Sequence, residues 1–149
     1  MSDQQLIVMS DQQLIDTAKA PLIGYNEKDW DKVRASTTTD LVYDEVATHL
    51  KVEGIDQVLE AWQGWATAFP DSHLIFHDSS ESSGKVVLEL TFHGTHTGPM
   101  QTPDEEIPAT GKSVEIRVCC LVEVEDGKVK SIRHYFDMMT MMQQLGLAG

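Results

Sequence analysis

The stretch KSVEIRVCCLVEVEDGKVKSIRHYFDMMTMMQQLG, residues 112–146, decides the fold class. Apolar and polar residues alternate through much of it, as in a strand that buries one face. Residues 125–128 (EDGK) interrupt the alternation and are typical of a tight hairpin. After Asp137 the sequence MMTMMQQLG predicts a short helix, which Gly146 is suited to end. The stretch therefore predicts two long antiparallel strands followed by a helix.

The segments before this stretch complete the pattern. Residues 72–82 and 85–98 have strand periodicity, with breaks at Gly84 and from Gly98 to Gly111. Helical spacing of apolar residues marks the segment from Ser10 to Tyr25 and residues 54–69, and a shorter helix fits residues 29–35. Residues 41–49 (LVYDEVATH) read as a short extended segment. We expect an α+β domain in which a curved antiparallel sheet wraps around the N-terminal helices and closes an apolar pocket.

The N-terminus carries a short perfect duplication. Residues 1–7 (MSDQQLI) recur at residues 9–15, with a methionine opening each copy. Solenoid repeats need units of about 20 residues or more, so this is not a repeat architecture. We interpret residues 1–8 as a duplicated extension without function and residues 9–149 as one domain.

The charge of the chain limits its partners. Eleven basic and twenty-four acidic residues give a net charge of −13, with no basic run. Such a field opposes nucleic acid and anionic membranes, and no segment approaches the roughly 18 apolar residues that span a bilayer. Cys119 and Cys120 are adjacent on a predicted strand and would face opposite ways, which argues against a disulfide between them. We expect a cytoplasmic protein. The apolar pocket expected above, rather than the charge, favours a hydrophobic small molecule as its ligand.

Asp137 is the candidate for chemistry. It stands between the aromatic pair Tyr135–Phe136 and four methionines, at residues 138, 139, 141 and 142. Burial against such a surface would raise the pKa of the carboxyl group and make it a stronger base. Asp directly before a helix is also a common N-cap, and that role stays open.

Several motifs together resemble a known family. FPDSH, TFHGTHTG, ATGKSVEIR, VEDGKV and HYFDMMTMMQQLG occur in the order and approximate spacing of the SnoaL-like polyketide cyclases, an ester cyclase type within the NTF2-like superfamily of cone-shaped barrels. The resemblance covers the chain from about Leu14 to Leu147. It implies ring closure by intramolecular aldol condensation without metal or organic cofactor, and a homodimer.

The resemblance also implies site residues. Asp137 matches the acid/base of the family, and His49 matches a histidine found in the pocket of some members. This proton-transfer chemistry is of the lyase or isomerase type. Scattered histidines give no metal site, since His73 and His77 would lie roughly 13 Å apart on an extended strand.

Further residues are candidates for substrate binding. Arg133 and Tyr135 share strand parity with Asp137 and could contact the substrate, although Arg133 could instead pair with Asp137 and lower its pKa. His93 and His96 should face opposite ways, so only one of them can line the pocket. Arg117 and Trp62 complete the set, although packing is the better explanation for the tryptophan.

Two other functions stay open. An epoxide or ester hydrolase would position water with an Asp, Arg, Asp set, for which Glu115, Arg117 and Asp137 are a loose match. Alternatively, the cone binds a small molecule without catalysis, because many chains keep a fold and lose its chemistry.

Overall fold

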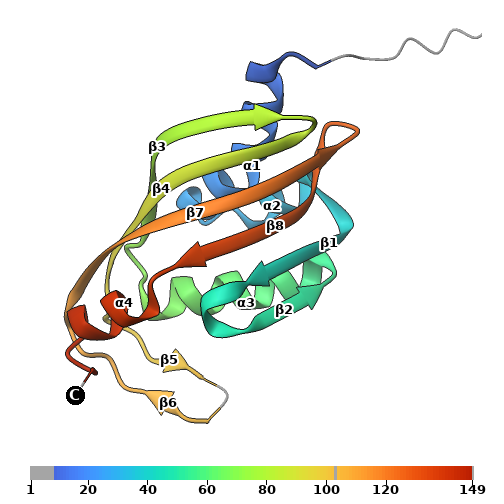
Figure 1. Cartoon of the computed structure of the whole chain (residues 1–149). Coiled ribbons are helices and arrows are strands. Elements are labelled where there is room, and N and C mark those ends of the chain that lie inside the picture. Colours follow the sequence, from blue (N-terminus) through green and yellow to red (C-terminus); the bar gives the residue numbers. More distant parts are fainter. Residues whose placement is uncertain (1–8, 103, 149) are drawn as a thin grey trace, which may run out of the picture.

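A six-stranded curved sheet with helices against one face forms the body of the molecule (Figure 1). The computed structural model describes residues 9–102 and 104–148, so the duplicated extension lies outside the described residues. The strand order across the sheet is β2 (Leu50–Glu53), β1 (Thr37–Glu45), β8 (Lys128–Phe136), β7 (Ser113–Glu125), β4 (Lys85–Thr95) and β3 (His73–Ser82). The helices are α1 (Asp11–Glu27), α2 (Trp30–Ser36), α3 (Ile55–Ala68) and α4 (Met138–Gln144). The predicted α+β class is confirmed.

The predicted β7–β8 hairpin turns at residues 126 and 127, both of which have positive φ. Gly146 follows α4 with a φ of 74°, a conformation that glycine adopts without strain, so the predicted helix end is also confirmed. Three features were not predicted, the first of which is the short strand β2 that pairs with β1. A small separate sheet pairs β5 (Met100–Gln101) with β6 (Glu106–Ile107), and β1 runs parallel to β8 whereas all other strand pairs are antiparallel.

The sheet buries one face of each central strand. On β7 the even-numbered side chains from Val114 to Val122 are buried, and the odd-numbered ones are exposed or partly buried. On β8 Ile132 is buried, and the side chains of His134 and Phe136 share its parity. The helices cover this inner face, so parity along a strand decides which side chains reach the interior.

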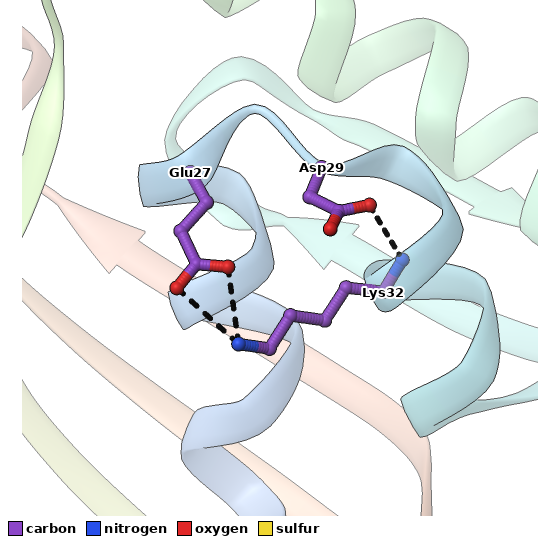
Figure 2. Close-up of polar contacts among 3 residues, drawn as sticks. All are labelled: Glu27, Asp29 and Lys32. Carbon is purple, nitrogen blue, oxygen red and sulfur yellow. Dashed lines mark hydrogen bonds and ion pairs between the residues drawn. The ribbon is translucent and has the colours of Figure 1, made fainter.

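The junction of α1 and α2 is closely packed. Figure 2 shows Lys32 donating to both carboxylate oxygens of Glu27, at 3.0 and 3.3 Å, while its backbone N–H is capped by Asp29 at 3.1 Å. Beneath this turn Gly24 lies against Val33, where a Cβ on the glycine would stand 2.8 Å from a Val33 methyl group. The glycine therefore permits the close approach of the two helices.

The core divides into two clusters. The larger lies between α1, α3 and the middle of the sheet, and the smaller joins the end of α3 to β7 and α4. Trp65 packs against both clusters, as do Phe92 and Phe136. These three rings meet edge to face, at centroid distances of 5.6 and 5.9 Å from Trp65, an arrangement that aromatic pairs prefer.

Candidate active site

An apolar cavity lies between the inner face of the sheet and the helices. Its empty space is about 570 Å³, including the part open to solvent. The helices, β1, β4 and β8 contribute aromatic rings, whereas the side chains from β7 are aliphatic apart from one cysteine. The cavity is lined by Leu22, Tyr25, Tyr43, Trp62, Trp65, Leu74, Phe92, Ile116, Val118, Cys120, Ile132, His134, Phe136 and Met141.

One end of the cavity is polar. Tyr43 and His134 lie on the neighbouring strands β1 and β8, and the Tyr43 Oη lies 3.4 Å from the His134 Nδ1. The same phenol donates to Oε2 of Glu45 at 2.5 Å. Glu45 is 2% exposed, so a carboxylate, a phenol and an imidazole form a connected polar group beside apolar walls.

Two further donors hold Glu45. The indole Nε1 of Trp65 donates to Oε2 at 2.9 Å, and the hydroxyl of Thr48 donates to Oε1 at 2.6 Å. Thr48 lies within hydrogen-bond distance of Glu45 because the chain forms a single 3₁₀ turn, Val46–Thr48, directly after β1. Hydrogen bonds to both oxygens offset the cost of burying the carboxylate.

The buried surroundings shift the pKa values of His134 and Tyr43. Burial lowers the pKa of His134 from its usual value, and the charge of Glu45 opposes this only in part. Burial also raises the pKa of the Tyr43 phenol well above its usual value, with Glu45 adding to the effect. At neutral pH His134 is therefore a neutral imidazole beside an un-ionised phenol.

Other polar atoms of the lining are paired or weakly acidic. The Tyr25 hydroxyl and Ser72 Oγ lie 2.6 Å apart, and burial raises the pKa of the phenol to about 12. Burial likewise raises the pKa of the Cys120 thiol to about 12. Cys120 is therefore no thiolate nucleophile at neutral pH.

Asp137 lies outside the cavity lining, and its expected burial is wrong. Its side chain is exposed, and Oδ1 accepts from the backbone N–H groups of Met139 and Thr140 at 3.0 and 3.3 Å. Oδ2 accepts from the Thr140 hydroxyl at 2.8 Å. These bonds lower the pKa of the carboxyl group, and the bond from the Thr140 hydroxyl has the largest effect. A lowered pKa makes the carboxylate a weaker base, the opposite of what burial was expected to do. Asp137 is the N-cap of α4, the alternative that the sequence left open.

Three candidate substrate contacts lie on the outer face of the sheet. Arg133 and Tyr135 are exposed on β8, with parity opposite to that of His134. Arg117 is exposed on β7, where its guanidinium is 3.8 Å from Glu89. Among the ion pairs of the described residues none joins Arg133 to Asp137, so the pairing considered from the sequence does not form. None of the three lines the cavity.

The remaining candidates are divided. His49 is exposed in a left-handed turn after the 3₁₀ helix, with a φ of 60°. His96 is completely buried, but it packs on Phe69 outside the cavity, while His93 faces the other side of the sheet next to His73. Trp62 lines the cavity at 4% exposure. Of the predicted site residues, the structure thus brings only Trp62 into the cavity.

Sequence reasoning missed Tyr43, Glu45 and His134. Ile132 and Phe136 are apolar residues in the second half of β8, and His134 shares their parity, which could have identified it as inward facing. On β1, Leu41, Tyr43 and Glu45 share a parity in the same way and are all buried. Parity counted from Asp137 follows the outer face of β8 instead. Proximity of β1 to β8 is a long-range contact for which the sequence has no local signal.

Comparisons with known proteins identify the family. The model of the SnoaL-like polyketide cyclase family matches residues 16–145. The chain belongs to this family. A search among curated proteins gave no significant match.

Solved structures of the SnoaL-like and NTF2-like kind share the fold. A protein from Jannaschia sp. CCS1 assigned as a SnoaL-like polyketide cyclase has a TM-score of 0.81 at 20% identity, over 100% of this chain and 99% of that one. TsrD from Streptomyces laurentii has a TM-score of 0.79 at 23% identity, over 94% and 99%. An LEH-like epoxide hydrolase from M. tuberculosis has a TM-score of 0.70 at 23% identity, over 91% and 90%. The expected NTF2-like architecture is thereby confirmed.

The part of the chain that the structure describes has no apparent metal site, since no group of three or more His, Cys, Asp or Glu side chains in it is arranged to hold a metal ion. Among the described helices, none has the length and apolar character to cross a membrane.

Proposed function

We propose that this SnoaL-like protein catalyses proton transfer on an apolar carbonyl compound, with aldol ring closure as the reaction and His134 as the acid/base. The observation that supports the proposal is the position of His134, an imidazole held neutral by burial in the wall of an apolar cavity. A neutral imidazole with a pKa below its usual value of about 6.5 is unprotonated at pH 7 and can accept a proton.

The reaction can be written with His134 alone. Its imidazole removes a proton from the carbon next to a substrate carbonyl, which leaves an imidazolium and an enolate. The enolate carbon then forms a bond to a second carbonyl carbon of the same molecule, whose electron pair moves to the oxygen. The imidazolium returns its proton to this alkoxide, so the ring closes without net gain or loss of atoms. Trp62 and the other aromatic walls would contact the substrate rings.

Asp137 remains the competing acid/base, because the family resemblance points to it. The structure gives it a capping role and an exposed position, which supports His134 instead. A hydrolase that uses Glu115, Arg117 and Asp137 has less support, since all three side chains are exposed rather than gathered in the cavity.

Exchange of substrate protons with solvent deuterium tests the proposal directly. The protein would be incubated in D₂O with a panel of β-polyketones and cyclic ketones, and loss of the α-proton signal would be followed by NMR. We expect His134→Gln to slow catalysed exchange and ring closure by about 10²-fold or more, the usual contribution of an acid/base, while Asp137→Asn retains both.

Each other outcome counts against the proposal. Loss of exchange in Asp137→Asn together with retention in His134→Gln would return the acid/base role to Asp137. Saturable binding of the ketones by the parent protein without exchange would indicate a noncatalytic binding protein. The expected homodimer and cytoplasmic location stay predictions, which light scattering and fractionation would check.

A further inference from the structure

We infer that Tyr43 and Glu45 are positioning residues that hold His134 in the tautomer with a free Nε2 directed to the substrate. This inference rests on the proposed function of His134, and it adds how the base is prepared. It depends on hydrogen-bond geometry at three side chains on β1 and β8.

The count of protons decides the tautomer. The Tyr43 hydroxyl has one proton, and two acceptors compete for it, Glu45 Oε2 at 2.5 Å and His134 Nδ1 at 3.4 Å. The short charge-assisted bond to the carboxylate takes the proton. The Tyr43 oxygen then presents only lone pairs to Nδ1. An unprotonated Nδ1 would place two lone pairs against each other, so Nδ1 carries the hydrogen and Nε2 is the acceptor.

Glu45 can perform this task because its position is set independently of His134. Trp65 and Thr48 donate to its two oxygens from α3 and from the 3₁₀ turn. Among the described residues no ion pair includes Glu45, so its negative charge is held by these hydrogen bonds and by Tyr43. The carboxylate therefore remains a strong acceptor for the phenol proton.

The negative charge of Glu45 also stabilises His134 once the imidazole has accepted a proton. Glu45 favours the protonated form of His134, although burial has the larger effect in the resting protein. The other ionisable groups facing the imidazole are neutral at pH 7, namely Tyr43 on β1 and Cys120, which lies opposite His134 on β7. Glu45 is thus the group that stabilises the imidazolium formed during the reaction.

Nitrogen NMR of the imidazole measures the tautomer without any substrate. In protein labelled with ¹⁵N, we expect His134 Nδ1 to show the shift of a protonated nitrogen and Nε2 that of an unprotonated one. In Tyr43→Phe the acceptor for Nδ1–H is removed, so the two nitrogen shifts should move toward each other as both tautomers become populated. Tyr25→Phe is the matched control, because its hydroxyl pairs with Ser72 instead, and it should leave the shifts unchanged.

Glu45→Gln gives a second and independent readout. Loss of the negative charge should lower the pKa of His134 further, so the rising limb of the kcat/KM profile moves to lower pH and kcat falls more than KM changes. Thermal unfolding would establish that both variants are folded. If only one is folded, its readout alone decides.

The results separate this inference from the proposed function. His134 shifts that are unchanged in Tyr43→Phe, or a pH profile that does not move in Glu45→Gln, would overturn the positioning role. If the shifts change as expected but His134→Gln retains exchange, the positioning role stands and the catalytic role of His134 is wrong.

Discussion

Asp137 and His134 are close in sequence, but only His134 lines the cavity. His134 enters the cavity from β8, whereas Asp137 follows the last strand residue and turns outward to cap α4. Their pKa values are both lowered, but for different reasons. Burial acts on the imidazole, and hydrogen bonds to the charged form act on the carboxylate. One chain segment thus supplies an imidazole to the cavity wall and an N-cap to α4.

Substitution of Asp137 should reveal the cap as a loss of stability. Asp137→Ala removes the acceptor for the first backbone N–H groups of α4, so we expect a lower midpoint of thermal unfolding. Asp137→Asn keeps an acceptor oxygen and should unfold close to the parent. Differential scanning calorimetry would measure both. An alanine variant that is as stable as the parent would show that the cap contributes nothing to the stability of the molecule.

Helix α4 was predicted from the sequence, but the contacts that attach it to the sheet were not. Of its methionines, Met141 lines the cavity, whereas Met139 is 61% exposed. The function of Gln144 was not evident from sequence. Its amide donates to the carbonyl of Glu115 at 3.0 Å and accepts from the N–H of the same residue at 2.7 Å. These two bonds fasten α4 to the exposed start of β7.

Substitution by alanine should change the stability of the protein in opposite directions at two helical glycines. Gly24 in α1 has no room, because an added Cβ would lie 2.8 Å from the Val33 methyl group and 3.2 Å from its backbone nitrogen. Gly64 in α3 faces open space, with nothing within 4 Å. We expect Gly24→Ala to lower the free energy of unfolding by about 1–3 kcal/mol, through overpacking. We expect Gly64→Ala to raise it by about 0.5–1 kcal/mol, through helix propensity.

Urea unfolding followed by circular dichroism would compare the two glycine variants under one condition. Gly64→Ala serves as the control for the general effect of alanine in a helix. Equal effects at both positions would contradict the close packing of α1 on α2, and a stabilised Gly24→Ala variant would show that the helices separate easily.

At the scale of the whole molecule, two buried histidines should make stability depend on pH. Burial lowers the pKa of both His96 and His134 in the folded state. The unfolded chain therefore binds protons more readily, with a pKa of about 6.5 for histidine. The stabilisation is complete above that pH and is lost as the pH falls toward the folded-state values. We expect the free energy of unfolding to decrease from pH 7 to pH 5.

His96→Asn would identify one source of this dependence. Asn retains an acceptor for the N–H of Thr110, which His96 Nδ1 accepts at 3.2 Å, but it does not titrate. Its stability curve between pH 7 and pH 5 should be flatter than that of the parent. His49→Gln, at an exposed position, is the matched control and should leave the curve unchanged. A curve of parental slope in His96→Asn would exclude this histidine as a source.

More of the fold than of the candidate site could be predicted from the sequence. Local signals such as the EDGK turn, Gly146 and the apolar face of α3 determine elements, and these were found where expected. The site depends on parity and on strand order, which are set by contacts far apart in the chain. The apolar neighbours of Asp137 predict an interior position for its side chain. Met139, two residues further on, is itself exposed, so apolar neighbours in the sequence do not indicate where a side chain points.

The parallel pairing of β1 with β8 has a consequence for the order of events during synthesis. Tyr43 and Glu45 are translated early, but their partner His134 lies on the last strand, with Glu45 opposite His134 in the register. A nascent chain synthesised through β7 therefore still lacks β8, the strand that lies between β1 and β7 in the sheet. Contacts so distant in sequence form slowly, because a long loop must be closed first. Until then β1 and β7 each lack a neighbouring strand, and unpaired strand edges of this kind favour aggregation.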